Sequence, residues 1–159
     1  MSAQELVAPA EPHRVFPDGS LIIRAAQVPW TPWTLPGTWF KLLDYDHNHS
    51  YTVILLKIAS DAPPVMHKHI GAANAYIISG GFGYEHGHVY AGDFMCEAGG
   101  VTHTPTAHPE GCVLLGFMHG AVQGFNADGS IAGVVDVDWY IEAAKQNNAF
   151  SHLEQVRRS

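Results

Sequence analysis

The sequence contains few cysteines, few basic residues and no long apolar run. Its 159 residues include 2 cysteines and 8 lysines and arginines against 15 acidic residues, so the formal net charge is −7. The basic residues do not cluster, which argues against a nucleic-acid-binding surface. No apolar run approaches the roughly 18 residues of a membrane-spanning helix. Residues 1–10 show neither the basic region nor the apolar core of a signal peptide. Cys96 and Cys112 are therefore expected to be free thiols in a cytoplasmic protein.

Short strand-forming runs separated by glycines fill the middle of the chain. The candidate strands are residues 38–43, 51–58, 74–79, 83–85, 89–90, 93–97 and 112–123. This pattern predicts an all-β sandwich or barrel over residues 37–136. The Pro-rich residues 1–36 are expected to form an irregular arm packed on the barrel. A hairpin is expected at Asp128-Gly129. Residues 137–159 are expected to form a short helix over residues 137–146 and a tail, with Asp138 as the helix N-cap. One domain is expected overall.

Histidine is abundant, with 11 residues, and three of the histidines have the spacing of a metal site. His67 and His69 lie two positions apart, so in an extended segment their imidazoles point to the same face. His103 follows a turn, a strand and a Gly-rich turn. Neutral imidazole is a preferred ligand of Fe, Cu, Ni and Zn. Three such ligands with open coordination positions predict a reactive metal centre rather than a structural one.

These residues resemble the first motif of the cupin superfamily, Gly-x5-His-x-His-x3,4-Glu-x6-Gly. His67, His69 and Gly80 fit this motif, while Asp61 stands where its first glycine is usual. The motif's glutamate, a metal ligand in the family, falls on Ala73 or Asn74. Alanine cannot ligate a metal and asparagine is a weak neutral donor, so the sequence predicts a site with three histidines and no glutamate.

The second cupin motif, Gly-x5-Pro-x-Gly-x2-His-x3-Asn, is also similar to this sequence. Gly92, Gly100 and His103 fit it at the expected spacing, with Ala98 where proline is usual. The resemblance implies a jelly-roll barrel, also called a double-stranded β-helix, with the metal inside it. It covers about residues 50–120.

Within the cupins, three-histidine iron sites are the pattern of acetylacetone dioxygenase and 2,4'-dihydroxyacetophenone dioxygenase. Residues 116–136 and the run His67-Lys-His-Ile-Gly71 resemble the second of these groups. The resemblance implies a non-haem Fe(II) dioxygenase that cleaves a C–C bond beside a carbonyl. Three neutral imidazoles would leave the full 2+ charge on the metal, which favours an anionic, oxygen-chelating substrate such as an enolate.

Three residues outside the trio, His119, Tyr76 and Glu97, are further candidates for the site. Alternation along the strand puts His119 and Phe117 on one face. If that face is interior, His119 would orient a substrate oxygen or act as a base; otherwise it is a core histidine bonded to the backbone. Tyr76 is expected to face inward with Phe117 and is the second catalytic candidate. Glu97 either accepts a hydrogen bond from a ligand histidine or faces solvent.

Several alternatives remain open on the sequence. The three histidines would be structural if the barrel had lost its metal. A second hypothesis for the function is a metal-binding sensor without catalysis, since the chain also resembles the cupin domain of zinc-binding anti-sigma factors. A third hypothesis is an isomerase, lyase or hydrolase that uses Zn, Ni or Mn. Water, a carboxylate or Asn74 would fill the fourth position. The expected partners are a small ketone and O2, and the expected assembly is a homodimer or, alternatively, a homotetramer.

Overall fold

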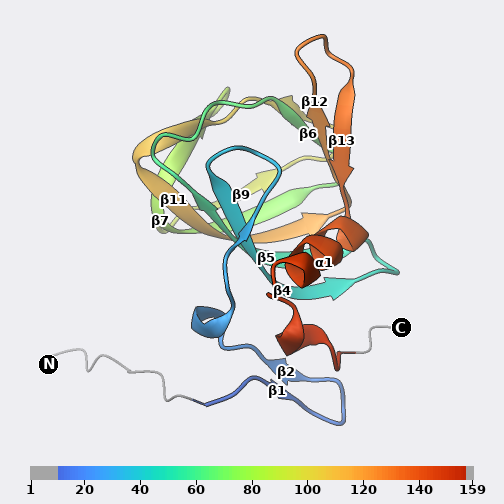
Figure 1. Ribbon diagram of the computed structural model, residues 1–159. Coiled ribbons are helices and arrows are strands. Elements are labelled where there is room, and N and C mark those ends of the chain that lie inside the picture. The colour runs from blue at the N-terminus through green and yellow to red at the C-terminus, as the bar shows by residue number, and fades with distance from the viewer. Residues whose placement is uncertain (1–10, 157–159) are drawn as a thin grey trace, which may run out of the picture.

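The computed structural model describes residues 11–156, which fold into a seven-stranded and a four-stranded antiparallel sheet, with a separate two-stranded pair in the N-terminal arm (Figure 1). The first ten residues of the predicted 1–36 arm and the last three of the predicted 137–159 segment lie outside the described residues. The predicted all-β jelly-roll architecture is confirmed. None of the helices within the described part of the chain has the length and apolar character needed to span a membrane.

The larger sheet has seven strands and forms most of the wall of the fold. Its order is β3 (Thr31–Pro32), β4 (Thr38–Asp46), β5 (Tyr51–Ile58), β11 (Thr106–His119), β7 (Ala73–Tyr84) and β8 (Gly87–Tyr90), and β9 (Phe94–Glu97) also pairs with β7. The smaller sheet has the order β10 (Thr102–His103), β6 (His67–His69), β12 (Val122–Phe125) and β13 (Ile131–Val135). The β12–β13 pair contains the hairpin predicted at Asp128-Gly129 and projects from the body of the fold (Figure 1).

The core lies on the concave face of the larger sheet. Side chains alternate between the two faces of a strand, and on β11 the buried members are Cys112, Leu114 and Met118. Leu114 pairs across the sheet with Leu56 of β5, which belongs to the same core cluster. Phe40 of β4 is fully buried in that cluster. Burial of these apolar side chains therefore fixes which face of each strand is interior.

Strand β7 runs through Gly80-Gly81, where the sequence predicted a break. Gly80 has a positive φ of 64°, and a Cβ at this position would lie 1.9 Å from the carbonyl oxygen of Gly111. Glycine is required here because the β7 and β11 backbones approach closely at an irregularity in their pairing. The two predicted strands at 74–79 and 83–85 are thus one strand with a local distortion.

Helix α1 (Val137–Gln146) packs against β4 with one face, on which its four buried residues lie. Val137, Tyr140, Ile141 and Ala144 are spaced three and four residues apart, so they form one apolar stripe. The Tyr140 ring meets Phe40 edge-on at 5.0 Å between centroids. The helix occupies the predicted residues 137–146, but its N-cap is Asp136, whose carboxylate accepts a hydrogen bond from Trp139 N at 2.9 Å. Asp138 is the second helical residue, so its prediction as the cap was wrong.

The N-terminal arm contains more regular structure than its composition suggested. It includes the paired strands β1 (Arg14–Val15) and β2 (Leu21–Ile22), the 3-10 helix η1 (Ala25–Gln27), and β3, which pairs with the edge of β4. The β1–β2 pair lies beside the C-terminal 3-10 helix η2 (Ser151–Leu153), where the rings of His13 and His152 are 5.3 Å apart (Figure 1).

Candidate metal centre

Two neighbouring strands bring the three predicted ligands together. His67 and His69 project inward from β6, while Lys68 between them is directed away. His103 on β10 pairs directly with His67 in the antiparallel register. All three imidazoles are buried, and one candidate ligand atom from each lies within 4.8 Å of the others. The period-two prediction for His67 and His69 is therefore confirmed, and His103 joins them through strand pairing.

A carboxylate also reaches this cluster, from a strand that the first cupin motif does not use. Glu97 on β9 has Oε1 2.9 Å from Nδ1 of His103 and Oε2 3.1 Å from Nε2 of His69. Its side chain is only 13% exposed. In the β7–β9 register Glu97 pairs directly with Ala73, one of the two positions where the motif's glutamate is usual. The predicted trio of histidines without a glutamate at the motif position is present, and of the two alternatives for Glu97 the structure shows the one beside the ligand histidines.

Electrostatics keep this carboxylate ionised. Burial alone would raise the pKa of Glu97, but the adjacent imidazoles of His103 and His69 outweigh it and hold the pKa at about 2. Burial lowers the pKa of His67 to about 4, with further lowering by the neighbouring His103 and His69. His67 is therefore neutral at pH 7, which is the form that ligates metals.

The protonation pattern of the imidazoles indicates that a cation fits between them. Nδ1 of His67 lies 3.1 Å from the Val65 carbonyl, so this nitrogen carries the proton and Nε2 is an acceptor. Nε2 of His103 is only 2.8 Å from Nε2 of His67. If Nε2 of His103 donates its proton to Nε2 of His67, Nδ1 of His103 is unprotonated. Two acceptors, this Nδ1 and the Glu97 carboxylate, would then face each other. A cation between the two Nε2 atoms would remove this conflict, because His103 would then carry its proton on Nδ1.

Distances and unpaired atoms support the same conclusion. Metal–nitrogen bonds of about 2.05 Å at a right angle place two nitrogens roughly 2.9 Å apart, close to the separation of the two Nε2 atoms. Nε2 of His69 and Oε1 of Glu97 are buried without a hydrogen-bond partner, since their short contacts lack hydrogen-bond direction. Buried polar atoms without partners are costly. A divalent ion would bind Nε2 of His69, and His103 would then donate its Nδ1 proton to Oε1 of Glu97, so the residues fit a bound metal.

Backbone contacts hold the ligand strands in place. A Cβ at Gly71 would lie 1.4 Å from the His119 carbonyl oxygen, so only glycine permits this close approach just after His69. On the other side, the Glu85 carboxylate accepts a hydrogen bond from Thr104 N at 2.8 Å and fixes the residue after His103. The ligands are thus placed by rigid strands and their immediate connections.

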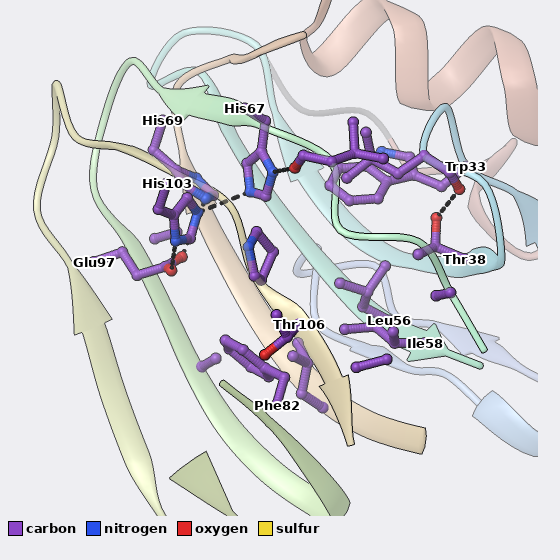
Figure 2. A pocket seen from close by; sticks show the side chains of 18 of the residues that line it. Trp33, Thr38, Leu56, Ile58, His67, His69, Phe82, Glu97, His103 and Thr106 are labelled. Atoms are coloured by element: carbon purple, nitrogen blue, oxygen red, sulfur yellow. Dashed lines mark hydrogen bonds and ion pairs between the residues drawn. The ribbon is translucent and has the colours of Figure 1, made fainter. Parts of the chain in front are cut away.

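A largely apolar cavity lies against the cluster (Figure 2). Its space measures about 770 Å³, including the part open to solvent. The three histidines and Glu97 gather at one side, and Trp33 lies on the other side, beyond His67. The remaining wall is made mainly by apolar side chains such as Leu56, Phe82 and Leu114. This is the form expected of a small-molecule site, with a few polar groups in an apolar enclosure.

The two predicted catalytic residues lie elsewhere. His119 is exposed on the outer face of β11, because its buried neighbour Met118 takes the inward position. Its ring packs near Tyr51 at 5.2 Å. Tyr76 is 47% exposed on the outer face of β7, where it pairs with Phe94. Neither residue lines the cavity. The prediction that Tyr76 faces inward was wrong, and the condition on which a catalytic role of His119 depended, an interior face, is not met. Alternation separates the two faces of a strand without saying which one is buried.

The fold and the site together define a cupin. More specifically, the family model of the ChrR cupin-like domain matches residues 18–123, so the chain belongs to that family. A comparison with curated proteins gives no match.

Solved structures of cupins resemble the chain over most of its length. An acetylacetone dioxygenase from Acinetobacter johnsonii has a TM-score of 0.70 at 16% identity, covering 80% of this chain and 91% of its own. A putative acetylacetone dioxygenase from Methylibium petroleiphilum PM1 has a TM-score of 0.69 at 18% identity, covering 77% and 92%. An RmlC-like cupin from Ralstonia eutropha JMP134 has a TM-score of 0.69 at 18% identity, covering 87% and 90%. At these identities the likeness establishes the fold alone.

Proposed function

We propose that this protein is a non-haem Fe(II) dioxygenase that cleaves a C–C bond next to a carbonyl in a chelating hydroxyketone or diketone. The observation that carries the proposal is the buried convergence of His67, His69 and His103 beside an apolar cavity. Two similar folds belong to proteins described as acetylacetone dioxygenases, one of them putative, which supports this reaction class. Bound Fe(II) would supply Lewis acidity toward a carbonyl oxygen and redox chemistry with dioxygen.

The chain's own contribution is charge balance, orientation and exclusion of water. Glu97 contributes one negative charge beside His69 and His103. A divalent ion with this carboxylate and a singly deprotonated chelating ketone adds up to zero net charge, which suits a cavity of low dielectric. The apolar walls exclude water from the reacting groups. The presence of Glu97 therefore favours a monoanionic enolate over the doubly charged ligands that a site without a carboxylate would accept.

The proposed reaction balances without a further reductant. One C–C bond of the ketone breaks, the O–O bond of dioxygen breaks, and one oxygen atom enters each of the two carbonyl-containing fragments. Only the ketone and O2 are consumed. This distinguishes the proposal from oxygenase reactions that need an added electron donor.

Oxygen consumption by defined metal forms tests the proposal. Metal-free protein is loaded with Fe(II) or Zn(II), and O2 uptake is followed with a panel of diketones and hydroxyketones. Uptake is expected only in the Fe(II) form, and His103→Ala should abolish it. Lys68→Ala is the matched control, because Lys68 lies between two ligands but is directed away from them. A fully Fe-loaded sample without uptake on any of these ketones would refute the proposal.

A second candidate is a metal-binding regulatory cupin without catalysis. It is favoured by the donor set of the site, because three buried imidazoles are nitrogen ligands that zinc prefers and the adjacent Glu97 carboxylate balances one of its charges. The ChrR cupin-like family model is compatible with it. Tight binding of one Zn(II) per chain, with no O2 uptake in the Fe(II) form, would favour this candidate over the dioxygenase.

A further inference from the structure

Trp33 is placed to bound the cavity at the end away from the metal ligands. Its backbone N–H donates to the Thr38 carbonyl at 3.0 Å, immediately after β3 pairs with β4. This hydrogen bond closes a tight connection that holds the arm against the edge of the sheet. Figure 2 shows Trp33 on the side of His67 opposite Glu97, with Thr38, Leu56 and Ile58 nearby.

Helix α1 packs against the side of the indole that faces away from the cavity, so the ring cannot easily move to enlarge the cavity. Trp33 packs against the core cluster that includes Tyr140, which is only 1% exposed. The indole Nε1 and the Tyr140 hydroxyl are both buried and lie close enough to interact with each other. A rigid wall of this kind sets a maximum length for any molecule that reaches inward from the metal ligands.

The cavity also selects by charge. Among residues 11–156, no lysine or arginine lines it, and Glu97 is the single acidic residue in its lining. Of the two threonines in the lining, Thr38 donates to the Leu35 carbonyl, and Thr106 donates to the Gly83 carbonyl at 3.4 Å. A charged group at the far end of a ligand would therefore lose its hydration without finding a counter-ion.

We propose that Trp33 is a specificity-determining residue, and that the ligand is a chelating ketone with an uncharged apolar chain that ends against its indole. This inference rests on the proposed function, which supplies the chelating group of the ligand. It adds the length and the charge of the ligand's side chain. The site would accept alkyl or aryl diketones of limited size and reject those that carry a terminal carboxylate or phosphate.

Binding to the Zn(II)-loaded protein tests the inference separately from catalysis. The probes are pentane-2,4-dione, heptane-2,4-dione and nonane-2,4-dione, with dissociation constants measured by calorimetry. Each methylene buried in the wild-type cavity is expected to tighten binding about fourfold until the chain meets Trp33, after which affinity falls. In Trp33→Leu the optimum should move to a longer chain, and in Trp33→Phe it should move less.

Charge selectivity has its own matched pair of probes. The ligand 4,6-dioxoheptanoate is heptane-2,4-dione with its terminal methyl replaced by a carboxylate, and it is expected to bind roughly 100-fold more weakly. Trp30→Phe is the control variant, since Trp30 lies in the same arm but stacks on Lys41 and Lys57 outside the cavity. It should leave both the length optimum and the charge discrimination unchanged.

The outcomes separate this inference from the proposed function. A shifted length optimum in Trp33→Leu supports the inference even if the Fe(II) form consumes no O2, in which case only the dioxygenase proposal fails. An unchanged length profile in both Trp33 variants, at one Zn(II) per chain, overturns the inference while leaving the dioxygenase standing. Equal affinity for the carboxylate and its neutral analogue overturns the charge argument. Absence of diketone binding to either metal form overturns both proposals.

Discussion

Glu97→Gln replaces the carboxylate beside the imidazoles by a neutral group of nearly the same shape. The structure places the two carboxylate oxygens 2.9 Å from His103 and 3.1 Å from His69. A partner that orients a ligand histidine typically changes metal affinity by about 10- to 100-fold, or about 1.4–2.7 kcal/mol. We expect a loss of that size if Glu97 acts through His103. A loss greater than about 1000-fold would instead indicate that Glu97 binds the ion directly.

Competition with a chromophoric zinc chelator measures this change. Glu85→Gln is the matched control, because Glu85 is also a carboxylate near His103 but contacts only the backbone N–H of Thr104, at 2.8 Å. Glutamine keeps an acceptor oxygen for that contact, so this variant should bind Zn(II) like the wild type. Far-UV circular dichroism of each variant establishes that the fold is retained. Equal zinc affinity for Glu97→Gln and the wild type would refute the role assigned to the carboxylate.

Three further predictions concern folding and assembly. Gly71→Ala should destabilise the protein by about 3 kcal/mol in thermal or urea unfolding, because its Cβ would overlap a backbone carbonyl, whereas Gly124→Ala has nothing within 4 Å and should have little effect. Burial lowers the pKa of His152, so the folded state binds fewer protons there than the unfolded state; stability should fall as the pH drops below about 6.5, and His152→Gln should reduce that slope. If the predicted homodimer forms through the outer sheet face, where Phe94 is 66% and Tyr76 47% exposed, Phe94→Glu should give monomers in light scattering, and an unchanged mass would place the interface elsewhere.

The acidic group beside the three histidines comes from a different position than the glutamate of the first cupin motif. The sequence has Ala73 and Asn74 where the motif's glutamate is usual, and a site without acidic groups was the natural prediction. In the structure Glu97 approaches from β9, the strand that pairs with this part of β7. The acidic group is thus supplied by a neighbouring strand at the same level of the sheet. The sequence left open whether Glu97 meets a ligand histidine or solvent, and its pairing with Ala73, which the sequence does not show, decides this.

Local patterns were reliable where one segment carried all the information. Strand β5 occupies the predicted residues 51–58, and helix α1 the predicted residues 137–146. The shared face of His67 and His69 also follows from their spacing alone. Each of these features depends on a backbone repeat and on neighbouring side chains, so the sequence is sufficient to predict it.

Features that depend on which face of a strand is buried could not be predicted from local sequence patterns. Tyr76 was assigned to the interior and the face of His119 was left open, and both residues lie on the outer face. A strand with apolar residues on both faces, such as β11, gives no local sign of which face packs against the core. The continuity of β7 through Gly80 likewise depends on how closely another strand approaches it.

The amino-acid sequence by itself determined the all-β character, the C-terminal helix and the trio of histidines, because residue spacing and side-chain periodicity act over a few neighbouring positions. The jelly roll was implied by the resemblance to the cupin motifs. Only the tertiary structure decided that Glu97 joins the histidines, that His119 and Tyr76 do not, and that Trp33 bounds the cavity. Those facts depend on the register between strands distant in sequence and on the burial of one sheet face, both of which are set by packing of the whole chain.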